Sequence, residues 1–163
     1  MFICGRRCRD WFGVGASREM FCFRHTKLPM PALKAFIVED SPVIRENLIA
    51  ALEELAPVEV VGSAEDEPTA IKWLVTCIGD CDLVIIDIFL KRGSGLGVLR
   101  AASDLQRPIS LVVLSNYATP DMRRKCLELG ASRVFDKSNE IDALILYCAR
   151  LAAGDTGYSE LAR

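Results

Sequence analysis

Five polar residues stand at the ends of apolar runs in this sequence, and their chemistry is complementary. They are Glu39, Asp40, Asp87, Ser115 and Lys137. Carboxylate oxygens bind hard divalent cations and can act as nucleophiles, a hydroxyl donates a hydrogen bond, and a lysine supplies a fixed positive charge. That combination suits phosphoryl transfer, whose transition state needs alignment and charge stabilisation more than covalent chemistry. An aspartate after a strand is also a common loop cap, so Asp87 alone does not separate the two interpretations.

The apolar runs before these residues predict strands. The run before Asp87, residues 83–86, is rich in β-branched residues and does not alternate with polar residues, which is typical of a strand covered on both faces of a parallel sheet. The expected strands are residues 35–38, 58–62, 83–86, 109–114 and 132–136.

Apolar residues at helical spacing follow every expected strand. Ser41-Pro42, Glu67-Pro68 and Thr119-Pro120 predict three helix starts, Gly93-Ser94-Gly95 a loop before a fourth helix, and Ser138 a cap for the last. The apolar faces expected for the first two helices are Ile44, Leu48, Ala51, Leu52 and Leu55, and then Ile71, Leu74, Val75 and Ile78, with Gly79 closing the second helix. Five strands alternating with five helices predict an α/β fold, a flavodoxin-like doubly wound parallel sheet in the order 2-1-3-4-5.

In such a sheet the carboxyl ends of all strands meet at one edge. The first and third strands flank the point where the strand order reverses, so Glu39, Asp40 and Asp87 are expected to converge there. Three crowded carboxylates repel one another, and a bound Mg²⁺ with carboxylate, carbonyl and water ligands would relieve that repulsion. The sequence therefore predicts a magnesium site with Lys137 and Ser115 beside it.

Composition indicates one folded domain with terminal extensions. The chain has 163 residues, of which 51% are hydrophobic and 26% charged, with a net charge of −2. Residues 1–31 are expected to form a poorly ordered extension, 32–153 the domain and 154–163 a short tail. The first 31 residues hold six Lys/Arg against two acids, which leaves the remainder acidic and argues against direct nucleic-acid binding. No apolar run reaches the length of a membrane span or a signal peptide, so a cytoplasmic location is expected.

Seven cysteines and a single histidine, His25, do not form a metal-binding pattern. Cys77 and Cys81 are four positions apart, but no second pair or nearby histidine completes a zinc site. The cysteines after residue 31 lie mostly within apolar patterns. They are expected to be small buried hydrophobic residues in a reducing compartment, in preference to metal ligands or disulfides.

The chain resembles the receiver domain of two-component response regulators (the CheY-like superfamily), of the standalone single-domain type. The resemblance covers residues 33–153, about three quarters of the chain. The motifs that carry it are Glu39-Asp40, Asp87-Ile-Phe-Leu with Gly95, Ser115, Gly130-Ala131 and Asp136-Lys137-Ser138.

The resemblance implies a role for each of these positions. Asp87 would be the phosphoacceptor, and Asp40 and Asp87 would bind Mg²⁺, with Glu39 acting through water and Phe89 through its backbone carbonyl. Lys137 would pair with the phosphoryl oxygens, and Ser115 would move to bind the phosphoryl group. The domain would catalyse only its own phosphorylation and dephosphorylation, so it is not expected to act as an enzyme on other molecules.

Four positions depart from the family or vary within it. Val134 stands where the family often has an aromatic residue, and its neighbour Phe135 is expected to face the other way. Lys91 replaces a frequent proline. Phe89 and Tyr117, two residues after Asp87 and Ser115, occupy places that influence how water reaches the phosphoryl group, so slow self-dephosphorylation is expected.

The resemblance also implies partners. A sensor histidine kinase or histidine phosphotransfer protein would donate the phosphoryl group, and a downstream protein would bind the face of the fourth helix, fifth strand and fifth helix. The protein would act as a monomer or a phosphorylation-dependent dimer, with no output domain after residue 153. Arg123, Arg124 and Lys125 are interpreted as a solvated helix face, with a docking patch as the alternative. The competing functions are a phosphate-independent pseudo-receiver, a fragment of a larger transcriptional regulator, and a small phosphohydrolase, which would need an acid where Phe89 stands.

Overall fold

The computed structural model describes residues 32–77 and 81–155. The expected N-terminal extension, Ile78 and Gly79 of the second helix and most of the expected tail lie outside these residues. No helix within the described ranges is long and apolar enough to cross a bilayer.

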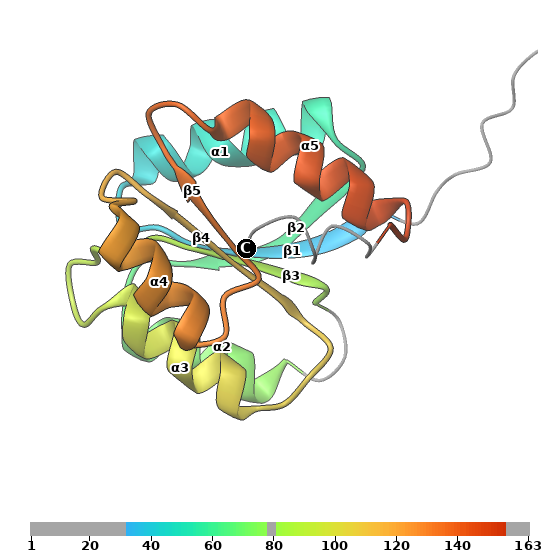
Figure 1. Cartoon of the computed structure of the whole chain (residues 1–163). Coiled ribbons are helices and arrows are strands. Elements are labelled where there is room, and N and C mark those ends of the chain that lie inside the picture. The colour runs from blue at the N-terminus through green and yellow to red at the C-terminus, as the bar shows by residue number, and fades with distance from the viewer. Residues whose placement is uncertain (1–31, 78–80, 156–163) are drawn as a thin grey trace, which may run out of the picture.

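Five parallel strands form one sheet in the order β2-β1-β3-β4-β5 (Figure 1). Their bounds are β1 Leu33–Val38, β2 Val58–Ala64, β3 Leu83–Ile86, β4 Ser110–Ser115 and β5 Arg133–Asp136. This confirms the predicted fold and strand order. Val38 pairs with Ile86 across β1 and β3, so the two strands end level with each other and the residues that follow them meet.

Five helices cover the two faces of the sheet. They are α1 Pro42–Leu55, α2 Glu67–Thr76, α3 Gly95–Asp104, α4 Pro120–Glu128 and α5 Ile141–Ala152. Helices α1 and α5 lie on one face and α2, α3 and α4 on the other (Figure 1). The central strands are therefore shielded from water on both sides, which explains why their sequences are continuously apolar.

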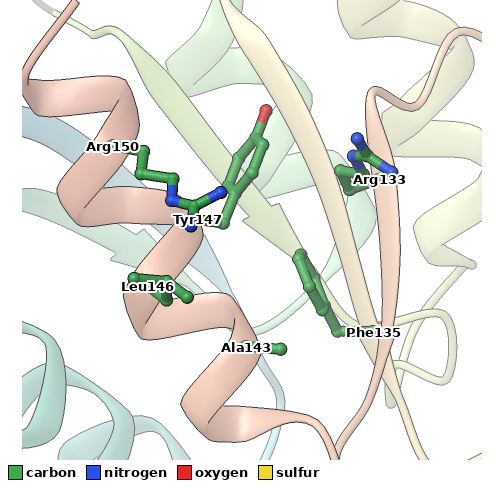
Figure 2. Close-up of a pocket in the computed structure, with 6 residues that line it drawn as sticks. All are labelled: Arg133, Phe135, Ala143, Leu146, Tyr147 and Arg150. Carbon is green, nitrogen blue, oxygen red and sulfur yellow. The ribbon is translucent and has the colours of Figure 1, made fainter. Parts of the chain in front are cut away.

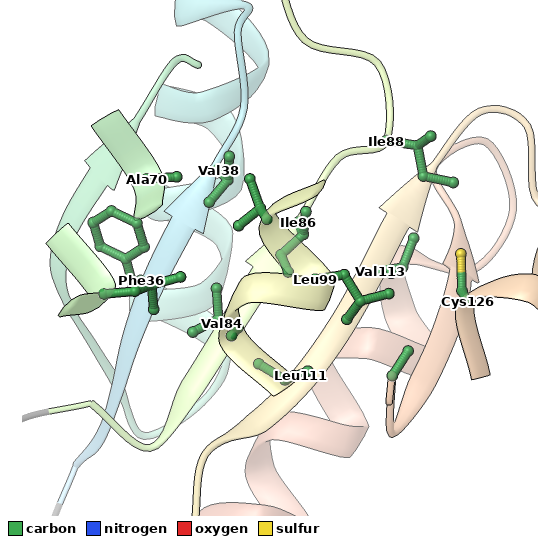
Figure 3. Close-up of a cluster of buried hydrophobic side chains, with 14 of the residues drawn as sticks. Phe36, Val38, Ala70, Val84, Ile86, Ile88, Leu99, Leu111, Val113 and Cys126 are labelled. Atoms are coloured by element: carbon green, nitrogen blue, oxygen red, sulfur yellow. The ribbon is translucent and has the colours of Figure 1, made fainter. Parts of the chain in front are cut away.

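Alternate residues of each strand enter two separate cores. Phe36, Val84, Ile86 and Val113 pack with α2, α3 and α4 (Figure 3). The intervening residues of the same strands pack with α1 and α5. At the β2 edge, Trp73 of α2 stacks on Phe36 with ring centroids 3.7 Å apart.

Helices α1, α2 and α4 begin where the sequence predicted, whereas the predicted cap of α5 is wrong. Ser41 and Thr119 cap α1 and α4, as predicted. Ser94 caps α3, although the sequence predicted only a loop there. Helix α5 begins at Ile141 with Glu140 at its N-cap position, so the prediction that Ser138 caps it was wrong. The Glu140 side chain accepts a hydrogen bond from the backbone N–H of Asp136 and does not cap the helix.

The predicted apolar faces of α1 and α2 are too wide. Ile44 and Leu55 of α1 and Val75 of α2 are exposed, whereas Leu48, Leu52 and Leu74 are buried. Helical spacing places a residue on an arc of the helix, but the width of the neighbouring sheet decides how much of that arc is covered.

Candidate functional site

Three carboxylates and one lysine converge at the carboxyl edge of the sheet. Oxygens of Glu39, Asp40 and Asp87 all lie within 4.8 Å of one another. The Lys137 ammonium donates to Glu39 Oε2 and to Asp87 Oδ2, the latter at 2.7 Å. Glu39, Asp87 and Lys137 have side chains that are at least nine-tenths buried, so these charges interact with little screening by water.

Backbone hydrogen bonds between neighbouring strands hold these residues in place. The N–H of Asp87 donates to the Val38 carbonyl at 2.9 Å, and the N–H of Lys137 donates to the Ser115 carbonyl at 3.2 Å. Gly95 packs against this loop, since its N–H donates to the Ile88 carbonyl and a Cβ there would lie 1.9 Å from the carbonyl oxygen of Asp87. The chain passes so close to Asp87 that no side chain fits at position 95.

The two carboxylate oxygens of Asp87 make different contacts. Its Oδ1 accepts a long hydrogen bond, 3.4 Å, from the backbone N–H of Phe89, which is the local loop contact. Its Oδ2 is held by Lys137. Because 3.4 Å exceeds the usual range for such a bond, Oδ1 is the less constrained oxygen.

The donor set fits a hard divalent cation. All three candidate ligands are carboxylates, and Asp40 is only partly buried, so water can complete a coordination shell. Glu39 is more committed than the other two, since its side chain also accepts from the backbone N–H of Ser41 at 3.2 Å. Asp40 and Asp87 therefore offer the freer oxygens.

Two further cations reach the site, and the sequence analysis assigned neither of them to it. The Lys91 ammonium donates to the backbone carbonyl of Asp40 at 3.1 Å, and the Arg45 guanidinium donates to that of Glu39 at 2.9 Å. Lys91 thus connects the loop after β3 to the loop after β1. In the sequence, the only indication of the contact between Lys91 and Asp40 was that a lysine replaces a frequent proline at position 91.

Phe89 and Tyr117 form an aromatic pair beside the site. Their ring centroids are 4.8 Å apart at an interplanar angle of 58°, and about half or more of each residue is exposed. Tyr117 is positioned partly by Ser115, whose Oγ accepts its N–H at 3.4 Å, while the Ser115 side chain itself is fully buried.

Val134 and Phe135 lie on opposite faces of β5. Val134 packs with the α2, α3 and α4 side and Phe135 with the α1 and α5 side, so Phe135 faces the direction that the sequence predicted. Phe135 contacts Tyr147 of α5 with ring centroids 5.9 Å apart. The two rings belong to a groove between β5 and α5 (Figure 2). It is lined by Arg133, Phe135, Ala143, Leu146, Tyr147 and Arg150.

Arg123 is not part of a solvated helix face, and that interpretation was wrong for this residue. Its guanidinium donates to the carbonyls of Ala118 and Val134 and forms an ion pair with Glu140 at 2.6 Å. This hydrogen-bonded pair lowers the pKa of Glu140. Arg124 and Lys125 are exposed, and Arg124 pairs with Asp121 on the same helix.

The loop after β3 is anchored to the start of α2. Asp66 caps α2 through the backbone N–H of Thr69 at 2.9 Å and pairs with Arg92. Glu67 accepts the backbone N–H of Ser94 at 2.7 Å. Hydrogen bonds from Thr69 and Arg92 lower the pKa of Asp66 to about 2, so this anchor is charged at neutral pH.

The four cysteines of the described residues are free thiols. Cys126 and Cys148 are fully buried in the two cores, as predicted, while Cys77 and Cys81 are partly buried. Burial raises the pKa of Cys81 to about 11 and that of Cys148 to about 12, and it also raises the pKa of Cys126. These three thiols therefore stay protonated and are poor nucleophiles at neutral pH.

Comparison with known proteins assigns a family to this architecture. Residues 35–148, well over half of the chain, match the family described as response regulator receiver domain. The chain is 31% identical over 107 residues to protein-glutamate methylesterase/protein-glutamine glutaminase 2 of Oleidesulfovibrio alaskensis. That match covers 64% of this chain and 29% of the relative. The chain therefore spans less than a third of that relative's length.

Solved structures share the fold. The Francisella response regulator 1452 receiver domain superposes with a TM-score of 0.66 at 20% identity, over 75% of this chain and 98% of that chain. A response regulator from Burkholderia pseudomallei superposes with a TM-score of 0.62 at 19% identity, over 79% of this chain and 74% of that one. The Burkholderia structure contains a phosphorylated aspartic acid, a calcium ion and citrate.

Proposed function

This chain belongs to the response regulator receiver domain family, and on that premise we propose that Asp87 accepts a phosphoryl group in two-component or phosphorelay signalling. The observation that carries the proposal is the contact between Lys137 and Asp87 inside a cluster of three carboxylates. A lysine that binds one oxygen of a buried aspartate leaves the other oxygen for attack. The same lysine is then in reach of the phosphoryl oxygens that arrive.

The proposed transfer is a single displacement at phosphorus. Oδ1 of Asp87 attacks the phosphorus of a phosphohistidine on the donor, the new P–O bond forms as the P–N bond breaks, and the departing imidazole takes up a proton. Lys137 stabilises the charge on the transferring group, since it already donates to Oδ2. Because Gly95 has no side chain, the chain packs directly against the backbone of Asp87. This contact would hold the Asp87 backbone in position and so align the carboxylate for attack.

Asp40 and Asp87 would hold a Mg²⁺ ion in this site, with Glu39 acting through water and Phe89 through its carbonyl. When bound, the ion neutralises charge on the carboxylates and on the phosphoryl oxygens. The support for this assignment is the all-carboxylate donor set. It is also supported by the partly solvated position of Asp40.

We propose that Ser115 then donates its hydroxyl to the phosphoryl group and changes the surface formed by α4, β5 and α5. The groove beside Phe135 and Tyr147 lies on that surface, and Leu146 at its rim is 53% exposed, which suits an apolar contact with a downstream protein (Figure 2). The donor would be a sensor histidine kinase or a histidine phosphotransfer protein. The domain would catalyse only its own phosphorylation and dephosphorylation, in a cytoplasmic setting.

Labelling with a small phosphodonor tests the proposal directly. Wild-type protein incubated with Mg²⁺ and acetyl phosphate should gain one phosphoryl group by intact mass, and the label should be lost with hydroxylamine, as expected for an acyl phosphate. Asp87→Asn should take up nothing, while the matched change at the exposed Asp104 should leave uptake unchanged. Wild-type protein that takes up no label and binds no beryllofluoride would instead favour a phosphate-independent pseudo-receiver.

A further inference from the structure

Arg123 donates to acceptors on two separate stretches of the chain, one before α4 and one from β5 to the start of α5. Its Nε donates to the Ala118 carbonyl at 3.0 Å, and its Nη1 donates to the Val134 carbonyl at 2.5 Å. Its Nη2 pairs with Glu140 Oε2 at 2.6 Å. The acceptors belong to the loop before α4, to β5 and to the residue that precedes α5.

Both stretches carry residues of the proposed phosphorylation site. Ala118 lies three residues after Ser115, and Lys137 lies between Val134 and Glu140. Glu140 also makes a contact within the stretch from β5 to α5, because its Oε2 accepts a hydrogen bond from the backbone N–H of Asp136 at 2.6 Å. Arg123 therefore bridges the chain that follows the hydroxyl and the chain that holds the ammonium.

We propose that Arg123 is a positioning residue that couples the Ser115 and Lys137 segments to the start of α5, so that a phosphoryl group on Asp87 alters α5 through this guanidinium. The inference rests on the proposed function, since it needs Asp87 to be phosphorylated. It adds the residue through which the site reaches the α4–β5–α5 surface.

The geometry of the guanidinium supplies the physical reason. A guanidinium is planar and its donors form a rigid fork, so its three acceptors on the two stretches can be satisfied together only in one relative arrangement. A phosphoryl group offers new oxygens to Ser115 and Lys137 and draws both segments toward Asp87. Arg123 then either loses a bond or moves the beginning of α5 with the two loops.

Val134 provides a second argument for coupling through Arg123. It is a small side chain, buried in the core of α2, α3 and α4, and it contributes its carbonyl to Arg123. Because position 134 holds valine, there is no aromatic ring there that could turn inward when Ser115 moves. The hydrogen-bonded route through Arg123 joins the same strand to the loop after Ser115 without such a ring.

Neighbouring Arg124 supplies a matched control. It lies on the same helix and its side chain is 70% exposed, against 35% for Arg123. Its ion pairs with Asp121 and Glu128 stay within α4. Replacing Arg124 removes the same charge from the same helix without touching the loop before α4, β5 or α5.

Hydrogen exchange with and without beryllofluoride and Mg²⁺ tests the coupling. In the wild type, beryllofluoride should change amide exchange in peptides covering residues 138–147. Arg123→Met and Arg123→Lys should still be labelled at Asp87 by acetyl phosphate. The beryllofluoride-induced change in exchange over residues 138–147 should be reduced at least about fivefold relative to the wild type, which is the low end of ordinary allosteric coupling. Arg124→Met should respond as the wild type does.

The Lys variant separates geometry from charge and guards against simple unfolding. It retains the charge and the aliphatic stem, but an ammonium cannot span three divergent acceptors, so it should not restore the response. An Arg123→Met or Arg123→Lys protein with the full wild-type response would overturn the inference alone. A wild-type protein that is not labelled at Asp87 would overturn the proposed function and the inference with it.

Discussion

The rings of Phe89 and Tyr117 contact each other, with centroids 4.8 Å apart at 58°, and so join the residues two positions after Asp87 and Ser115. The pair lies beside the proposed phosphorylation site, and we expect it to restrict the approach of water from that side. Neither ring is deeply buried, since Phe89 is 53% and Tyr117 61% exposed. The ring contact adds to the backbone contacts of Phe89 with Asp87 and of Tyr117 with Ser115.

Removing either ring should speed the loss of phosphate from the phosphorylated protein. Phe89→Ala or Tyr117→Ala is expected to raise the dephosphorylation rate of labelled protein about tenfold, which corresponds to ~1.4 kcal/mol of barrier. The measurement is the decay of labelled protein followed by intact mass. Leu127→Ala, which removes an exposed apolar side chain from α4, is the control. If neither aromatic substitution accelerates the decay, the rings do not shield the phosphoryl group.

Lys91 should weaken binding of the divalent cation. Its ammonium on the Asp40 carbonyl places a positive charge beside the proposed ligands. Lys91→Met is therefore expected to raise Mg²⁺ affinity about threefold at low ionic strength, with a smaller gain in high salt because exposed charges are screened. Titration calorimetry with MgCl₂ measures this. Lys125→Met, the same charge change in the last turn of α4, should leave the affinity unchanged; equal gains in both variants would point to net charge alone.

A side chain at position 95 should disturb the site through the backbone of Asp87. A Cβ at Gly95 would lie 1.9 Å from the Asp87 carbonyl oxygen, so Gly95→Ala must displace the β3–α3 connection. We expect a loss of about 3 kcal/mol in the free energy of unfolding, the upper part of the usual overpacking range. Urea denaturation measures it. Gly154→Ala, where nothing lies within 4 Å of the added Cβ, should cost about 1 kcal/mol from its positive φ alone; a similar loss at both positions would refute the steric argument.

Acidification should weaken the anchor of α2 at Asp66. Hydrogen bonds from Thr69 and Arg92 hold the folded pKa of Asp66 at about 2, below the value of 3.8 for an unperturbed aspartate. The ionised side chain therefore adds stability above about pH 4, and that contribution is lost as the pH falls from about 4 to about 2. The unfolding free energy of the wild type should approach that of Asp66→Asn over this window. A difference that stays constant with pH would show that Asp66 does not titrate as proposed.

The sequence was sufficient to predict the sheet because its signals are local. Each strand is a short apolar run, and Ser41 and Thr119 cap helices where a proline follows them. Parallel strands bring their carboxyl ends to one edge, so the strand ends alone were enough to group Glu39, Asp87 and Lys137, which do lie in contact.

Other features depend on contacts between distant segments. Arg123 reads as one of three solvated cations in sequence, and only the arrival of Val134 and Glu140 from β5 and the start of α5 makes it a bridge. Glu140, the residue at the start of α5, is bound by Arg123 from α4, a contact that the sequence does not indicate.

The sequence by itself determined the strands, the starts of α1, α2 and α4 and the identity of the residues at the carboxyl edge, because backbone sterics and apolar periodicity act over a few residues. Tertiary structure alone decided which charges pair and which helix faces stay in water. The tertiary structure pairs Arg123 with Glu140 and brings the Lys91 ammonium to the backbone carbonyl of Asp40. It also leaves Ile44 and Leu55 exposed. Ion pairing and burial depend on which segments the fold brings within a few ångströms of each other, and residue spacing along the chain does not contain that distance.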